Sequence, residues 1–179
     1  MAETSADFER RLAKTKLLVL DVDGVLTDGR MIYGNYGDEL KCFDAHDGFG
    51  IVTLGRLGIP TVILSSKKSR INQKRARELR IAGVYQNAKD KLKVLRDISK
   101  KFKVATEEIC FMGDDWMDLP VLLRVGCAVA VGNAVDEVKA KVHYVTQKEG
   151  GRGAVREVTD LILKAKNKWD EATAQYLRP

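Results

Sequence analysis

Two aspartates, Asp21 and Asp23, follow the apolar run Leu17–Leu20 and stand directly before Gly24. An apolar run of this length is typical of a buried strand, and chemistry in open α/β sheets gathers at the carboxyl ends of the strands. Two carboxylates there, on a loop that can curl round a ligand, indicate a metal and phosphate site. Taken alone, the pair could equally cap a turn or bind an ion for structural purposes.

A second acidic group stands at the end of another predicted strand, over residues 109–112. Its members are Asp114, Asp115 and Asp118. Carboxylates packed this closely at a strand end are costly unless a cation or a basic partner lies nearby. This group therefore supports a metal site more specifically than the first pair does.

Two further positions could contact a phosphate. Ser65 ends the strand predicted over residues 61–64, where its hydroxyl could donate to a phosphoryl oxygen. Lys91 opens the helix predicted over residues 90–102, and a fixed ammonium there would offset negative charge at a phosphate site. Lys89 and Lys93 are rivals for that role, and a serine after a strand is also common as a helix cap.

These positions are delivered by alternating strands and helices, which predict a doubly wound parallel sheet. A hairpin over residues 30–43 is the one insertion near the first acidic pair. We expect this β-α-β chain to have an α/β, Rossmann-like fold without a cap domain. The other elements expected are strands over 84–85, 127–131 and 144–145 and helices over 48–57, 69–80, 117–123, 134–140 and 154–165.

The pattern Asp21-Val22-Asp23-Gly24 resembles the nucleophile motif of the haloacid dehalogenase superfamily, whose commonest members are phosphatases. All four groups occur in that superfamily's order. The resemblance implies that Asp21 attacks phosphorus to form an aspartyl-phosphate, with Asp23 as general acid and base. It further implies Mg²⁺ held by Asp21, Asp23 and Asp114, and roles for Ser65 and Lys91 on the phosphoryl group. Asp115 and Asp118 would hold the metal shell or the lysine in place.

Within the superfamily, the chain resembles the 3-deoxy-D-manno-octulosonate 8-phosphate phosphatases and their sialic-acid-type relatives. Phe43-Asp44-Ala45-His46-Asp47-Gly48 and Gly150-Gly151-Arg152-Gly153 carry this likeness, together with the acidic motifs. It implies magnesium-dependent hydrolysis of a keto-sugar-acid phosphate in lipopolysaccharide biosynthesis. It also implies a homotetramer in which a neighbour's hairpin and tail close each site.

By position, the resemblance assigns several residues to substrate binding. Lys67 and Arg75 would lie near the substrate's anionic groups, and Arg152 would help to pin the tail. The sugar site would be lined by Asp44, Ala45, His46, Asp47 and Gly48.

Three departures from the family pattern leave the substrate open. The run Ser65-Ser66-Lys67 replaces the usual threonine-glycine-arginine or threonine-glycine-glutamate. His46 stands where arginine or lysine is frequent, and Val52 where octulosonate enzymes tend to have arginine. A nine-carbon ulosonate 9-phosphate is therefore a second candidate substrate. Rival functions for the chain are a non-catalytic assembly module, a phosphotransferase or phosphomutase, and a response-regulator receiver.

The composition fits a single globular domain over residues 1–179. The chain is 45% hydrophobic and 31% charged, which allows a core over about residues 15–165. The charged tail over residues 166–179 is expected to be loose. Cys42, Cys110 and Cys127 fit no zinc or disulfide spacing and indicate reduced core thiols.

Charge and hydropathy restrict the partners. The net charge of +6 favours anionic ligands such as a phosphorylated sugar acid. The basic run over residues 67–80 lacks interleaved aromatic residues, so we expect no nucleic acid. No apolar stretch approaches the roughly 20 residues of a membrane span, and the polar N-terminus is unlike a secretory signal. A cytoplasmic location is therefore expected.

Overall fold

The protein is built round one six-stranded parallel sheet, described here for residues 5–177 of a computed structural model. Every neighbouring pair of strands is parallel, as predicted. Along the sheet the strands are β5 (Gly83–Tyr85), β4 (Thr61–Leu64), β1 (Leu17–Leu20), β6 (Ile109–Gly113), β7 (Cys127–Ala130) and β8 (Tyr144–Val145).

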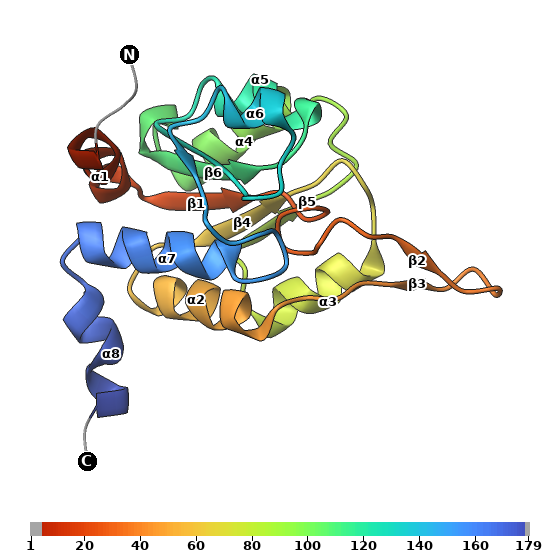
Figure 1. Cartoon of the computed structure of the whole chain (residues 1–179), viewed down its shortest axis with the longest axis horizontal. Helices are drawn as coiled ribbons and strands as arrows, with labels where there is room; N and C mark the ends of the chain where they lie inside the picture. The colour runs from red at the N-terminus through yellow and green to blue at the C-terminus, as the bar shows by residue number, and fades with distance from the viewer. Residues whose placement is uncertain (1–4, 178–179) are drawn as a thin grey trace.

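Helices cover both faces of the sheet, which makes the predicted doubly wound arrangement (Figure 1). In that view α2, α3 and α7 lie below the sheet, and α4, α5 and α6 lie above it. The residues of β1, β4, β6 and β7 are all buried, because both faces of these strands are covered. The helices are α1 (Ser5–Lys14), α2 (Ala45–Arg56), α3 (Arg70–Glu78), α4 (Lys91–Phe102), α5 (Leu119–Leu122), α6 (Asp136–Lys139), α7 (Ala154–Ala165) and α8 (Trp169–Leu177), with 3₁₀ turns η1 (Thr106–Glu108) and η2 (Trp116–Asp118).

The winding reverses between β1 and β6. From β1 the chain moves through β4 to β5, and it then crosses back to β6, β7 and β8 on the other side. Such a switch point leaves a crevice outside the carboxyl ends of the two central strands, where ligands bind in open α/β sheets. The pair Asp21 and Asp23 follows β1, and the acidic group that begins at Asp114 follows β6.

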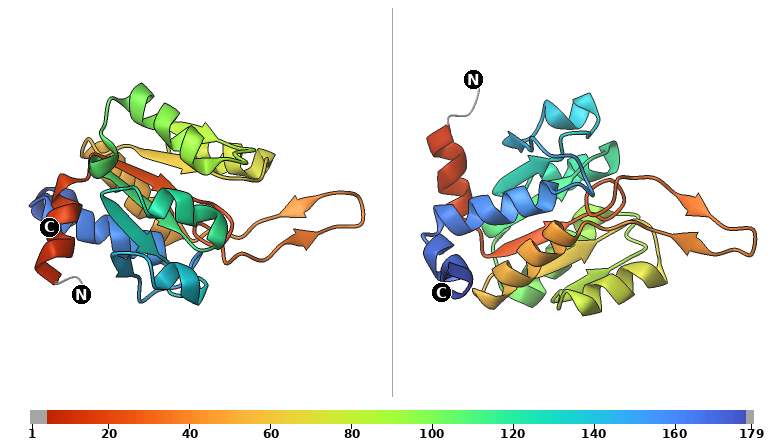
Figure 2. Two further views of the ribbon diagram at one scale, coloured as in Figure 1. Left: turned by 90° about the horizontal axis from the view of Figure 1, so that it is seen from above. Right: turned by 60° about the horizontal axis from the view of Figure 1, so that its bottom comes forward.

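The predicted hairpin is present and projects far from the body of the molecule (Figures 1 and 2). Its strands β2 (Ile32–Tyr33) and β3 (Glu39–Leu40) pair antiparallel with each other and not with the main sheet. Within residues 5–177 a separate cap domain is not evident. Several apolar side chains of the hairpin are exposed. These side chains are Met31, Ile32, Tyr33, Tyr36 and Leu40.

Three expectations about the elements need correction. Helix α2 begins at Ala45 rather than at residue 48, because the Asp44 side chain accepts from the backbone N–H groups of His46 and Asp47 and caps it. The tail expected to be loose over residues 166–179 forms α8 up to Leu177, and its last two residues lie outside the described part. Cys42 is exposed, whereas Cys110 and Cys127 are buried.

Helix α1 was not predicted at all. It packs against α7 and β7, and its residues Phe8 and Leu12 are buried. In the part of the chain that the structure describes, no helix has the length and apolar character needed to cross a bilayer.

Helices α2 and α7 pack closely, and a buried acid links them. The Asp47 carboxylate accepts a hydrogen bond of 2.7 Å from the backbone N–H of Arg156 in the first turn of α7. Gly50 allows the close approach, since a Cβ there would lie 2.3 Å from Oγ1 of Thr159. Burial of Asp47 raises the pKa of its carboxyl from 3.8 to about 6.

The raised pKa predicts a pH-dependent cost to stability. As pH rises from about 4 to about 6, unfolded chains release the Asp47 proton before folded chains do, so the free energy of unfolding falls. Asp47→Asn keeps the acceptor without the charge. We expect it to be more stable than wild type by roughly 2 kcal/mol at pH 7.5 and nearly equal at pH 4.

Urea unfolding of both proteins at the two pH values measures this difference. Asp97→Asn, on the exposed side of α4, is the matched control. A difference between Asp47→Asn and wild type that stays the same at both pH values would contradict the assignment.

Candidate active site

The candidate site lies where β1 and β6 end side by side. Leu20 of β1 is in register with Met112 of β6, and the backbone N–H of Asp21 donates to the Met112 carbonyl at 3.1 Å. The residues that follow the two strands are therefore held together by the sheet itself. This adjacency joins Asp21 to the acidic group that begins at Asp114.

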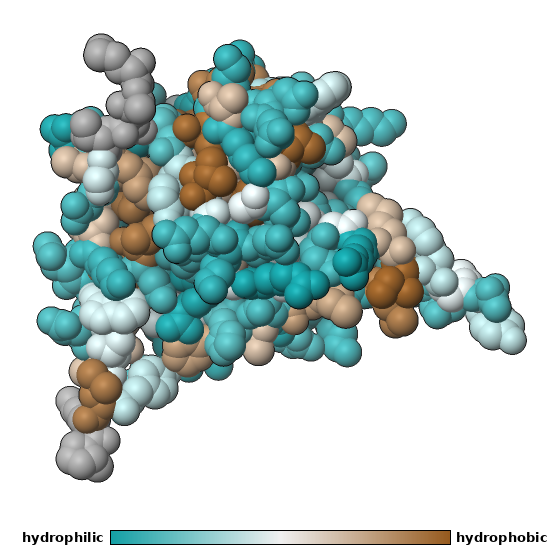
Figure 3. Space-filling model, in the orientation of Figure 1, coloured by the Kyte–Doolittle hydropathy of each residue, from teal (hydrophilic) through white to brown (hydrophobic). Residues whose placement is uncertain are grey.

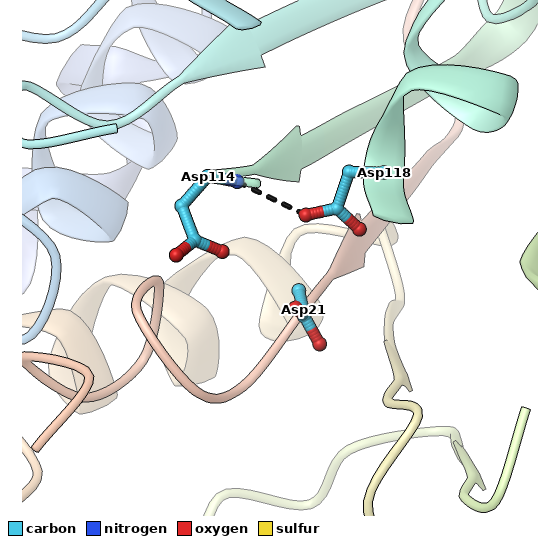
Figure 4. A group of neighbouring side chains, drawn as sticks. All are labelled: Asp21, Asp114 and Asp118. Atoms are coloured by element: carbon cyan, nitrogen blue, oxygen red, sulfur yellow. Dashed lines mark hydrogen bonds between the residues drawn. The ribbon is translucent and has the colours of Figure 1, made fainter. Parts of the chain in front are cut away.

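Three carboxylates meet at this point (Figure 4). Asp21, Asp114 and Asp118 each offer an oxygen, and these oxygens all lie within 4.8 Å of one another. One hard cation could touch all three, and all-oxygen ligand sets suit Mg²⁺. The geometry thus fits the metal that the motifs predicted, with Asp118 in the group rather than the carboxylate of Asp23.

Burial and crowding make this cluster electrostatically unfavourable without a cation. Desolvation and, next, the charge of Asp118 raise the pKa of Asp21 to about 6. Desolvation, Asp21 and Asp118 raise the pKa of Asp114 to about 8. A divalent cation would remove most of this repulsion, which is a second reason why these residues fit a metal.

Lys91 is the lysine that reaches the cluster. Its side chain is 3% exposed, and its Nζ lies 2.9 Å from Oδ2 of Asp21 and 2.6 Å from Oδ1 of Asp118. Although burial alone would lower the pKa of Lys91, the two carboxylates raise it above its ordinary value. The rivals Lys89 and Lys93 are exposed.

The carboxylate of Asp118 connects the Asp114 loop to Lys91. Its Oδ2 accepts from the backbone N–H of Asp114 at 3.0 Å, while its Oδ1 accepts from Lys91. Asp115 is not part of this group of three: its carboxylate accepts from the backbone N–H of Trp116 at 2.7 Å and caps η2. Asp118 thus contacts both the Asp114 backbone and Lys91.

Ser65 completes the set of four predicted groups. Its side chain is buried at the end of β4, and its Oγ accepts from the backbone N–H of Lys67 at 3.2 Å. All four groups line one cleft of about 310 Å³. The lining residues are Asp21, Asp23, Gly29, Met31, Ser65, Ser66, Lys67, Lys91, Asp114, Asp115, Met117 and Asp118.

Met31 of the hairpin lines the cleft, and other hairpin side chains contact residues of its lining. Lys67 Nζ lies 2.8 Å from Oε1 of Glu39 and 3.2 Å from the hydroxyl of Tyr33, both in the hairpin. Asp23 is engaged from the same direction, because its carboxylate forms an ion pair with Lys41. Lys67 is thus the one predicted substrate-binding residue among those that line this cleft.

The other predicted substrate-binding residues surround the first turn of α2. Asp44 caps the helix, exposed Ala45 begins it, and the side chain of His46 is 81% exposed. Asp47 contacts α7 as described above. None of these residues lines the cleft within the described chain.

Arg75 and Gly48 belong to the same region. The guanidinium of Arg75 donates to the Asp44 carbonyl at 3.1 Å and lies 5.6 Å from the centre of the Phe43 ring. A Cβ at Gly48 would come within 2.5 Å of Nη2 of Arg75. These contacts tie α3 to the start of α2 in this chain.

Sequence reasoning missed the close packing of glycines behind the site. Gly24 has a φ of +97°, and a Cβ there would lie 2.0 Å from Oδ2 of Asp114. A Cβ on Gly150 would lie 1.7 Å from the Gly24 carbonyl oxygen, so the two loops touch through bare backbone. The Asp-Gly dipeptide signals a turn, but only the folded chain reveals which loop presses against it.

Comparisons with known proteins identify the class of this site. A family model described as haloacid dehalogenase-like hydrolase matches residues 65–158. Over 173 residues, the chain is 42% identical to the 3-deoxy-D-manno-octulosonate 8-phosphate phosphatase of Escherichia coli K12, covering 97% of this chain and 92% of that protein. The chain therefore belongs to the haloacid dehalogenase-like hydrolases.

Solved structures agree with this assignment and with the predicted fold. The phosphatase of the same description from Yersinia pestis is 41% identical, with a TM-score of 0.90 over 92% of this chain and 89% of that one. Its counterpart from Moraxella catarrhalis, in complex with a magnesium ion, a phosphate ion and a KDO molecule, is 36% identical. That structure gives a TM-score of 0.94 over 97% and 99% of the two chains.

The contact between the loops of Gly24 and Gly150 predicts that a methyl group added at Gly150 lowers stability, whereas one added at an open glycine does not. Gly150→Ala forces the loop off the Gly24 carbonyl, so we expect it to lose about 1–3 kcal/mol of stability and lower the melting temperature. Gly55→Ala, in α2, is the matched control, because a Cβ at that position would meet no atom within 4 Å. It should be neutral or stabilise by about 0.5–1 kcal/mol. Equal melting temperatures for the two variants would contradict this account of the loop.

Proposed function

We propose that this chain is a magnesium-dependent phosphatase that hydrolyses 3-deoxy-D-manno-octulosonate 8-phosphate. The observation that carries the proposal is the meeting of Asp21, Lys91 and Asp114 in one cleft. The relatives from E. coli and Y. pestis with this described activity resemble the chain over more than nine-tenths of its length. An enzyme acting on this sugar acid would serve lipopolysaccharide biosynthesis in the cytoplasm.

In the first half of the reaction, Asp21 is the nucleophile. Its carboxylate oxygen attacks phosphorus and forms an aspartyl-phosphate while the bond from phosphorus to the sugar oxygen breaks. Asp23, two residues along the same loop, protonates the departing sugar oxygen. Ser65 donates to a phosphoryl oxygen, and the ammonium of Lys91 offsets the charge of both the nucleophile and the phosphoryl group.

In the second half, Asp23 acts as a base. It takes a proton from water, whose oxygen attacks the phosphorus and releases phosphate from Asp21. The exchange returns both aspartates to their starting state. The role of Asp118 is to position Lys91 and the Asp114 backbone through the two hydrogen bonds of its carboxylate.

The carboxylates of Asp21 and Asp114 would hold the magnesium ion, with Asp118 close enough to share it. Asp23, which the motif also predicts as a ligand, lies on the same loop. When bound, magnesium supplies positive charge that lets an anionic phosphate approach an anionic carboxylate.

The sugar-acid end of the substrate would extend toward Lys67 and the hairpin. We propose a homotetramer in which a neighbouring subunit's hairpin and tail help to close each cleft around Asp44–Gly48 and Arg75. The five exposed apolar side chains of the hairpin support this assembly, and Figure 3 displays hydrophobic surface where the hairpin leaves the body. Arg152 would then help to pin the tail, and neither nucleic acid nor a membrane has a part.

A nine-carbon ulosonate 9-phosphate is a second candidate substrate. The run Ser65-Ser66-Lys67 departs from the octulosonate pattern, and Lys67 is paired with Glu39 of the hairpin. The assembled cluster of Asp21, Lys91 and Asp114 argues against a non-catalytic assembly module, which would not need these groups together.

Removing the nucleophile tests the chemistry. Asp21→Asn should lower kcat for 3-deoxy-D-manno-octulosonate 8-phosphate by at least about 10³-fold, because an amide cannot form the covalent intermediate. Phosphate release in the presence of Mg²⁺ is the measurement, with Asp97→Asn as the matched control. Equal, slow release by the wild type and Asp21→Asn would refute the enzyme proposal. A wild-type preference of about 100-fold in kcat/KM for the nine-carbon substrate would select that substrate instead.

Metal addition tests the carboxylate cluster separately from turnover. Mg²⁺ at about 100 times its Kd should stabilise the wild type by about 2.7 kcal/mol, because the ion binds the folded cluster. This stabilisation appears as a rise in melting temperature when Mg²⁺ is added, and Asp114→Asn should lose most of that rise. A rise of equal size in both proteins would place the ion elsewhere.

A further inference from the structure

The foot of the hairpin carries a lysine that is buried although most of the hairpin is exposed. The side chain of Lys41 is 3% exposed, and its Nζ forms an ion pair with Oδ1 of Asp23. Asp23 is 21% exposed in its side chain and lines the cleft. Eighteen residues separate the two partners, so this contact depends on how the hairpin docks.

The ion pair belongs to a chain of alternating charges. Lys41 Nζ also lies 3.9 Å from Oε1 of Glu39, and the same Glu39 oxygen lies 2.8 Å from Nζ of Lys67. Asp23 and Lys67 come from the body of the protein, whereas Glu39 and Lys41 come from one arm of the hairpin. The hairpin is thus fastened to the cleft by charged side chains at two points.

We propose that Lys41 is a positioning residue for the proton transfers of Asp23. An aspartate side chain on a loop can turn away from the leaving oxygen, and proton transfer requires it to stay within hydrogen-bond reach. The contact of the Lys41 ammonium with Oδ1 keeps the Asp23 side chain on the cleft wall and leaves Oδ2 to carry the proton that is transferred. This inference rests on the phosphatase function proposed above, and it makes the hairpin part of the catalytic apparatus within its own subunit.

Two other roles for Lys41 make different predictions. A lysine that only stabilises the fold would slow every substrate alike when replaced. One that binds the carboxylate of the sugar acid would affect that substrate alone. A positioning role predicts that the loss depends on whether the leaving group needs a proton.

A pair of simple substrates separates these roles. Benzyl phosphate releases a basic alkoxide that needs protonation, whereas p-nitrophenyl phosphate releases a stable phenolate that does not. For both, kcat/KM reports the steps through aspartyl-phosphate formation. We expect Lys41→Met to lower kcat/KM for benzyl phosphate about 10–100-fold and for p-nitrophenyl phosphate less than about 3-fold. Lys41→Arg should recover most of the loss, and Lys100→Met, on the exposed side of α4, is the matched control.

A second measurement uses the sugar-acid phosphate itself. Because Lys41 acts through Asp23, its replacement should have little further effect in the Asp23→Asn background. Equal losses on both simple substrates, a loss confined to the sugar acid, or an undiminished effect in the Asp23→Asn background would each overturn the inference. An inactive wild type on all three substrates would instead refute the proposed function.

Discussion

The crowding of negative charge between the ends of β1 and β6 is the constraint on which this structure depends. Three carboxylates have oxygens within 4.8 Å of one another, and the ammonium of Lys91 contacts two of them. One buried ammonium does not balance three carboxylates, and burial together with this repulsion raises the pKa of both Asp21 and Asp114. A divalent cation held here would complete the balance and would leave Asp21 ionised, the form that the proposed attack on an anionic substrate needs.

Strand register, a helix N-terminus and close loop packing hold this unfavourable cluster together. The parallel register of β1 and β6 fixes Asp21 beside Asp114. Lys91, at the N-terminus of α4, contacts the carboxylates of Asp21 and Asp118. Behind the cluster, Gly24 and Gly150 allow two loops to meet without side chains. The hairpin adds charges of both signs beside the cleft, because Glu39 pairs with Lys67 and Lys41 pairs with Asp23.

The four polar groups were predictable because each depends on local signals and one rule of topology. Apolar runs mark the strands, and the carboxyl ends of neighbouring parallel strands must meet.

Residues 44–48 illustrate the opposite case. Their placement depends on a cap by Asp44 and on packing against α7, more than 100 residues away in sequence. The ion pair of Lys41 with Asp23 has the same character, since no pattern in the sequence predicts how a hairpin docks. Helix α8 was missed because its charged sequence indicates a loose tail, whereas its contacts with α7 and α2 are not visible in the sequence.

The carboxylates of Asp21 and Asp114, which follow β1 and β6, would hold one shared cation. A crystal structure of the protein grown with Mn²⁺, whose anomalous scattering marks its position, tests this most directly. The account predicts a single anomalous peak within coordination distance of carboxylate oxygens from both Asp21 and Asp114. A peak that contacts neither residue, or no peak in the cleft of a fully active protein, would contradict it.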